Sequence, residues 1–388
     1  MALAVTDSFP LSEMLSHVES WSAIPSGSVY SSGLERLAEK LQHDFHRLPT
    51  ESSECLWLRT ANGKSRPLLL FRQRTAAPCR LLLFGHFDTV YGSEVKPTIR
   101  DGDRLIGPGV LDMKGGLAIL LWGLAAFERG LAEKRIGWTV ALNSDEELGS
   151  PDSAKVFREL AQQHQYGFGF EPALPNGAIA SARRGSGNFR FTFRGKATHS
   201  GRNPQAGKNA LLPLARFILR TAALNQDCPD VFINPAVVSA GSAVNVVPDQ
   251  AICDVNVRTS KPEDEAWIRS QFADFVRNET PEFPIEFTGR FGAPPKPETP
   301  QSRRLLQLVQ LAGSRMNLEL KTEPTGGSCD GNRLAALGVP NIDNLGARGN
   351  YLHSPEEYLE TASLPERARL LLEVFNEVNE RLGSSSQI

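Results

Sequence analysis

The stretch RLLLFGHFDTV, residues 80–90, carries the strongest structural signal in this sequence of 388 residues. It opens with an apolar run that ends at Gly85, a pattern typical of a strand buried on both faces of a sheet. His86 and Asp88 follow at once, and in an extended chain their side chains point to the same side. The stretch therefore predicts an α/β fold with functional side chains at the carboxyl end of a strand.

The segments that follow repeat this pattern. Leu117 to Glu128 predicts a buried helix that stops at Gly130, and residues 136–142 and 167–170 predict further buried strands. Strands that alternate with helices in this way predict right-handed crossovers and a mostly parallel sheet.

The pattern changes near residue 184. Phe189, Phe191 and Phe193 alternate with polar residues, which predicts a half-exposed strand. The order βαββαβ then predicts a small ferredoxin-like α+β domain over 184–292, inserted into a catalytic domain made of 1–183 and 293–388. The elements expected after the first strand are a helix over 207–223, strands over 233–240 and 250–258, a helix from Pro262 and a strand over 283–288.

The chain returns to the first pattern after Pro297. We expect helices over 303–315 and 365–382 and a strand over 340–345. The Ser-rich tail from Ser384 is expected to be disordered.

Composition and charge exclude several classes of protein. Lys and Arg number 42 against 44 Asp and Glu, so the chain has no general electrostatic attraction for nucleic acid or an anionic membrane. The longest apolar run, 117–127, is shorter than the roughly 20 residues of a membrane span, and the first residues lack the features of a secretory signal. The five cysteines are scattered without CxxC spacing, which favours reduced thiols. We therefore expect a cytoplasmic α/β enzyme with no nucleic-acid or membrane partner.

Acidic residues and histidines gather where the expected strands end. Ligands of open α/β sheets cluster at these ends, so the residues are candidates for one common site. They are His86 with Asp88, Asp112, Glu146 with Glu147, Glu171 and, further downstream, His353.

Each candidate also has an ordinary structural explanation. His86 can cap a strand, and Asp112 can be the N-cap of the helix that follows it. Glu146 and Glu147 can be first-turn acids of a short helix, and the remaining acid and histidine can lie in solvated loops. A single metal site would explain all of these positions at once.

The motifs around these residues resemble the M20 family of metallopeptidases and amidohydrolases, especially its carboxypeptidase G2-like (glutamate carboxypeptidase) branch. They occur in order along nearly the whole chain, including the expected insertion. The motifs are GHFDTVY (85–91), GPGVLDMKGG (107–116), NSDEELGS (143–150), FEPA (170–173), GKATHSG (195–201), NVVP (245–248), and TGGSCDGN with LGARGNYLHS (within 325–354).

The resemblance implies a site for two zinc ions bridged by Asp112. Three carboxylates and two imidazoles would also suit cobalt or manganese. The implied ligands besides Asp112 are His86 and Glu171 for one ion, and Glu147 and His353 for the other.

The resemblance also implies how such a site would work. A metal-activated water would attack an amide carbonyl, with Glu146 as the general base. Asp88 would orient His86, as outer carboxylates do for metal-bound imidazoles. His199 of the inserted domain would stabilise the carbonyl oxygen from across a dimer interface. The inserted domain would then serve dimerisation and closure of the site.

The substrate-binding residues are implied less directly. Arg290 and Asn245 occupy positions where the family binds a substrate carboxylate, although Arg290 could also be an ordinary surface arginine. Gly327 resembles a residue that lines the substrate pocket. Cys329 and Asn332 depart from the family pattern, so the resemblance does not imply glutamate specificity.

We expect a homodimeric hydrolase that cleaves the amide C–N bond of an N-acyl or peptide-type amino acid with a free carboxylate. One alternative is deacetylation, or hydrolytic deamination of an aromatic amine, on the same scaffold. A second alternative is a catalytically silent relative that only binds ligands.

Overall fold

The computed structural model describes residues 9–94, 96–130, 133–279 and 281–382, so the tail from Ser384 lies outside the described residues. The chain divides into two compact units, which are described separately below. The first unit comprises Met1–Ala182, Glu298–Thr325 and Cys329–Ile388, and the second comprises Arg183–Pro297 with Gly326–Ser328.

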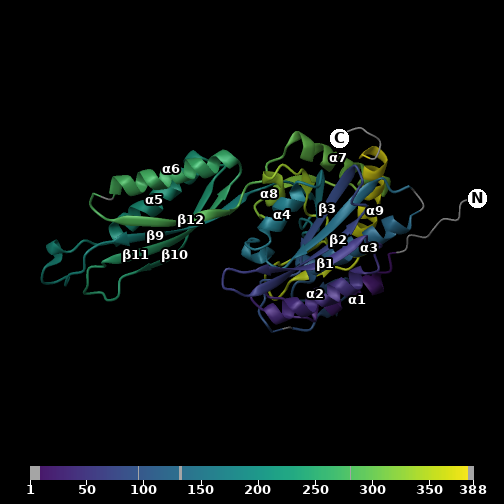
Figure 1. The fold of residues 1–388 in the computed structure, drawn as a ribbon. Helices are drawn as coiled ribbons and strands as arrows, with labels where there is room; N and C mark the ends of the chain where they lie inside the picture. The colour runs from purple at the N-terminus through teal and green to yellow at the C-terminus, as the bar shows by residue number, and fades with distance from the viewer. Residues whose placement is uncertain (1–8, 95, 131–132, 280, 383–388) are drawn as a thin grey trace, which may run out of the picture. The chain divides into compact units, whose positions relative to one another are not determined.

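The first unit combines helices with short and long strands (Figure 1). Its helices are α1 (Leu11–Ser22), α2 (Ser31–Phe45), α3 (Gly116–Arg129), α4 (Ala154–Ala161), α7 (Pro300–Arg315), α8 (Asp330–Ala336) and α9 (Ser363–Leu382). Its strands are β1 (Ser52–Arg59), β2 (Ser65–Gln73), β3 (Cys79–His86), β4 (Ile99–Asp101), β5 (Arg104–Ile106), β6 (Ile136–Asn143), β7 (Tyr166–Gly169), β8 (Ile179–Arg183, leading into the second unit), β13 (Thr322–Thr325), β14 (Asn341–Ile342), β15 (Gly349–Asn350) and β16 (Tyr358–Glu360).

The central sheet confirms the expected α/β class. In the described part of the chain it has six strands in the order β1-β2-β6-β3-β7-β14. β6, β3, β7 and β14 run parallel to one another, whereas β2 is antiparallel to both β1 and β6. The parallel strands all end at one edge, which brings the residues that follow them together.

Helices cover both faces of this sheet, which explains the uninterrupted apolar run of β3. Leu81 and Leu83 pack into a large core shared with α1, α2, α3, α7 and α9. Leu82 and Phe84 point the other way, into a smaller core formed with α4 and α8. A strand buried on both faces has no polar alternation, as the sequence indicated.

The stretch Val110–Arg129 is the one described helical segment long and apolar enough to cross a membrane by length and composition. It includes α3, and 94% of its most apolar window is buried inside the protein. It packs against α9 and α1 as a core helix of the first unit.

The second unit has the element order β9 (Gly185–Arg194), α5 (Leu211–Asp227), β10 (Phe232–Ala240), β11 (Gln250–Thr259), α6 (Pro262–Glu279) and β12 (Ile285–Ala293). Its strands form an antiparallel sheet in the order β10-β11-β9-β12. Both helices lie along one face of this sheet (Figure 1), where Phe191 packs between Phe217 and Phe272. A role of this unit in dimerisation stays a prediction.

Several expected boundaries were wrong. α5 begins at Leu211 rather than residue 207, because Lys208 pairs with the backbone of Lys196. β14 covers only Asn341–Ile342 of the expected 340–345, since Asn344 forms an antiparallel bridge to Phe170 instead. The helices α1 and α2 and the strands β1 and β2 were not predicted.

Candidate metal centre

Three neighbouring parallel strands deliver candidate ligands to one edge of the central sheet. His86 is the last residue of β3 and lies opposite Asn143, the last residue of β6. The turn Glu146–Leu148 follows β6 directly. Gly169 ends β7 two positions before Glu171. The edge therefore collects an imidazole and several carboxylates from segments far apart in sequence.

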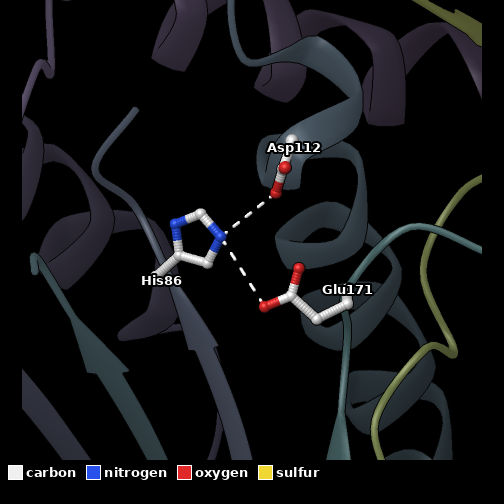
Figure 2. Close-up of side chains that lie close together, drawn as sticks. All are labelled: His86, Asp112 and Glu171. Atoms are coloured by element: carbon white, nitrogen blue, oxygen red, sulfur yellow. Dashed lines mark hydrogen bonds and ion pairs between the residues drawn. The ribbon is translucent and has the colours of Figure 1, made fainter. Parts of the chain in front are cut away.

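The first candidate ligand group consists of His86, Asp112 and Glu171. Figure 2 shows the imidazole of His86 facing both carboxylates. Its Nε2 lies 3.1 Å from Oδ1 of Asp112 and 3.7 Å from Oε1 of Glu171. One nitrogen and two carboxylate oxygens thus face a common point.

The second candidate group consists of Asp112, Glu147 and His353. Nε2 of His353 lies 3.4 Å from Oδ2 of Asp112 and 3.3 Å from Oε1 of Glu147. Asp112 therefore belongs to both groups and turns a different oxygen toward each histidine. A carboxylate in this position can bridge two ions.

The electrostatics of the two groups favour bound cations. Burial acts against a charged His86, but the charge of Glu171 and hydrogen bonds to Asp112 outweigh it and raise the pKa of His86 well above its usual value. The nearby carboxylates of Asp112 and Glu147 raise the pKa of His353 to about 10. Burial alone would raise the pKa of Asp112, yet its contacts with the two histidines lower it. Carboxylates at this edge thus attract positive charge strongly.

The donor set fits a pair of divalent cations. Imidazole nitrogens and carboxylate oxygens are ligands that zinc, cobalt and manganese accept. Oε1 of Glu147 is buried and has no hydrogen-bond partner in the described structure, although Nε2 of His353 lies nearby. A buried oxygen without a hydrogen-bond partner destabilises the folded protein unless a cation or a donor binds to it.

Asp88 connects His86 to the loop after β6. Its Oδ1 lies 3.3 Å from Nδ1 of His86. Its carboxylate also accepts hydrogen bonds from the backbone N–H groups of Glu146 and Glu147, each at 3.2 Å, and from Oγ of Ser28 at 2.8 Å. This completely buried carboxylate is therefore placed to orient the imidazole and to hold the loop.

Glu146 lies beside the ligand groups without belonging to either of them. Burial, followed by the charge of Glu171, raises the pKa of Glu146 well above its usual value. A carboxyl group with a raised pKa can accept and return a proton near neutral pH.

The other predicted site residues belong to the second unit. His199 pairs with the backbone of Val246, and its Nδ1 accepts a hydrogen bond of 3.0 Å from the N–H of Gly201. The carbonyl of Asn245 accepts from the N–H of Ser200, so His199 and Asn245 lie on adjoining loops.

Arg290 lies on β12 opposite Asn188, and the carbonyl of Gly327 accepts a hydrogen bond of 3.3 Å from Arg183. These two residues, like His199 and Asn245, belong to the second unit, whereas the residues of both ligand groups belong to the first. Their roles toward the ligand groups stay predictions.

Glu357 and Tyr91 were not predicted as site residues. Oε1 of the buried Glu357 accepts hydrogen bonds from the N–H groups of Leu111 (2.9 Å) and Asp112 (3.0 Å). Its Oε2 accepts one from the hydroxyl of Tyr91 at 2.7 Å. Both residues lie inside or beside the quoted motifs, but no local pattern indicated that Glu357 supports the backbone of Asp112.

Comparisons with known proteins show the family of this chain. A family model described as peptidase family M20/M25/M40 matches residues 82–377. The chain is 30% identical to carboxypeptidase G2 of Pseudomonas sp. (strain RS-16) over 308 residues, covering 76% of this chain and 74% of that protein. It is 26% identical to a succinyl-diaminopimelate desuccinylase of Acidovorax ebreus over 334 residues, covering 80% and 84% of the two chains.

Solved structures share the fold. A tripeptidase of Staphylococcus aureus matches with a TM-score of 0.83 at 20% identity and covers 95% of this chain and 99% of its own. A dinuclear metal-binding M20 peptidase of Bacillus subtilis matches with a TM-score of 0.67 at 15% identity, covering 95% and 98%.

Proposed function

This chain belongs to peptidase family M20/M25/M40 and is a hydrolase acting on C–N bonds, and we propose that it cleaves the amide bond of an N-acyl or peptide-type amino acid with a free carboxylate. The observation that carries this proposal is the position of Asp112, whose two oxygens face two separate groups of ligand atoms. The similarity to a carboxypeptidase and a desuccinylase supports an amide substrate.

The ligand groups would hold two divalent ions, with zinc as the expected metal and cobalt or manganese as alternatives. Asp112 would bridge them, His86 and Glu171 would complete one site, and Glu147 and His353 the other. When bound there, such ions lower the pKa of a water molecule toward about 7 and polarise a carbonyl oxygen.

Glu146 would act as the general base. It takes a proton from the attacking water and returns it to the leaving nitrogen, so the C–N bond breaks while a C–O bond forms. The products are a carboxylic acid and an amine. The raised pKa of Glu146 suits a group that must carry this proton between the two steps.

Other residues would position the reactants. Asp88 holds His86 and the loop of Glu146 through the contacts described above. His199 would donate to the carbonyl oxygen where negative charge develops. Arg290 and Asn245 would bind the free carboxylate of the substrate, and Gly327 would line its pocket. The inserted domain would dimerise the protein and close the site, in a cytoplasmic enzyme.

The test combines metal analysis with an activity screen. The purified protein is loaded with zinc or cobalt, its metal content is measured, and hydrolysis is followed for N-acyl amino acids, small peptides, acetylated amines and arylamines. We expect two metals per chain and turnover of amides that carry a free carboxylate.

Turnover of acetylated amines or arylamines alone would instead support the deacetylase or aminohydrolase alternative. No turnover across the panel, together with equal ligand binding by Glu146→Gln, would support a silent relative.

A further inference from the structure

The loop after β6 carries the predicted base and one predicted ligand on the turn Glu146–Leu148. Asp88 holds the beginning of this turn, as described above. The turn ends at Gly149 and Ser150, whose N–H groups bond the carbonyls of Glu146 (2.6 Å) and Asp145 (2.8 Å). Gly149 and Ser150 both have positive φ, at 79° and 51°. This backbone conformation is unfavourable for serine, so contacts from elsewhere in the protein must stabilise the end of the turn.

Helix α8 supplies these contacts. Its first residue, Asp330, is 3% exposed, and Oδ1 of this residue accepts a hydrogen bond from the hydroxyl of Ser150. Oδ2 of Asp330 accepts another, of 2.8 Å, from the side-chain amide of Asn143, the last residue of β6. One helical turn later, Arg333 donates to the carbonyl of Gly149. α8 therefore bonds the loop on both sides of the turn.

α8 is itself fixed to the central sheet. The carbonyl of Gly331 accepts a hydrogen bond of 2.9 Å from the side-chain amide of Asn341 in β14. A Cβ at position 331 would lie 2.3 Å from Oδ2 of Asp343, so glycine permits this close approach. Leu334 packs with α4 in the smaller core. Asp330 thus projects toward the loop from a helix that the sheet and α4 hold in place.

An acidic residue in the first turn of a helix has an ordinary explanation, because it interacts favourably with the helix dipole. Two observations show that Asp330 does more than this. Both of its oxygens bond side chains of the loop after β6. Burial raises the pKa of Asp330 to about 6, so at neutral pH its charge lowers the stability of the folded state. Stability alone therefore does not explain a carboxylate at this position.

We propose that Asp330 is a positioning residue of the reaction, which fixes the end of the turn so that Glu146 and Glu147 face the two ligand groups. The proposal rests on the proposed function and adds to it a residue that belongs to neither ligand group. Asp88 would hold the beginning of the turn, and Asp330 would hold its end through Ser150. Loss of Asp330 would therefore displace the base without removing it.

The experiment compares two substitutions of Asp330 in the zinc-loaded full-length protein, on the amide that the activity screen identifies. Asp330→Ala removes both acceptors. Asp330→Asn is the conservative variant, because its amide oxygen can accept from Asn143 and its amide nitrogen can donate to Oγ of Ser150. We expect kcat to fall about 10–100-fold in Asp330→Ala with KM within about twofold of the wild type, and kcat to stay within about threefold in Asp330→Asn.

Asp44→Ala is the matched control. Asp44 is also a buried carboxylate of the first unit, and it accepts hydrogen bonds from Trp21 and Lys40 on α1 and α2. Its loss should lower stability in urea unfolding, as the loss of Asp330 does, but should leave kcat at the wild-type value. Ser150→Ala removes a single donor to Asp330 and serves if Asp330→Ala does not fold; it should lower kcat by about tenfold.

Zinc binding gives a readout that does not depend on turnover. Calorimetric titration of the metal-free protein should show one of two ions bound about tenfold more weakly in Asp330→Ala, because Glu147 belongs to one ligand group only. Asp330→Asn and Asp44→Ala should bind both ions as the wild type does. Equal kcat and equal zinc binding in Asp330→Ala and Asp44→Ala would overturn the positioning role.

The two readouts separate this proposal from the proposed function. No turnover of any amide by the wild type, together with weaker zinc binding in Asp330→Ala, would refute the proposed function alone. Turnover by the wild type, with kcat and zinc binding unchanged in Asp330→Ala, would refute the positioning role alone.

Discussion

Replacing Glu357 tests whether a side chain outside the ligand groups holds the bridging residue Asp112 in place. Glu357→Ala removes the acceptor of two backbone N–H groups, those of Leu111 and Asp112. The hydroxyl of Tyr91 keeps a hydrogen-bond acceptor in this variant, because it also lies 2.8 Å from the carbonyl of Ser354. Each buried donor left without a partner costs about 1–3 kcal/mol, so the variant should lose about 2–6 kcal/mol of stability.

Glu357→Gln is the matched control. Its amide oxygen can accept both N–H groups, and its amide nitrogen can donate to the Tyr91 hydroxyl, which then donates to Ser354. Burial raises the pKa of Glu357 above its usual value because it disfavours the charged carboxylate. Replacing this carboxylate by a neutral amide should therefore change stability by less than about 1 kcal/mol.

The assay is urea unfolding of the metal-free variants, followed by titration with zinc. Glu357→Ala should unfold at lower urea and bind zinc more weakly than Glu357→Gln, since the backbone of Asp112 loses its support. Equal stability of the two variants, or zinc binding unaffected in Glu357→Ala, would refute the reasoning.

The remaining predictions concern the ligands, the base and a buried acid. Elemental analysis should find almost no metal in Asp112→Asn and about one ion fewer than the wild type in Glu171→Gln, because only Asp112 faces both ligand groups. Equal losses of metal in the two variants would contradict a bridging role of Asp112. Glu146→Gln should lower kcat by about 10²–10⁴-fold while the metal content stays at the wild-type value; loss of metal would instead make Glu146 a ligand. Burial raises the pKa of Asp330 to about 6, so the folded protein binds the proton of this carboxyl group more tightly than the unfolded chain does. The stability that this proton adds to the folded state is lost as the pH rises from about 4 to about 6. Asp330→Asn should flatten this part of the curve of unfolding free energy against pH, and an unchanged slope would show that Asp330 does not cause it.

Periodicity predicted the elements whose burial is uniform. β3 and β6 have apolar residues on both faces, and α3 is buried nearly all round, so their signals do not depend on the rest of the chain. α1 and α2 mix apolar and charged residues and were missed. The start of α5 was misjudged because a pairing between Lys196 and Lys208 holds the preceding residues outside the helix.

The sequence by itself determined which residue types end the buried strands, and therefore the α/β class and the chemistry available at that edge. Only the tertiary structure decided that one carboxylate, Asp112, turns its two oxygens toward His86 and His353. The same holds for Glu357, which supports a backbone segment 245 residues away in the chain. Contacts of this kind arise where strand ends and loops meet in space. Secondary-structure propensity cannot predict them, because it depends only on the neighbours of each residue along the chain.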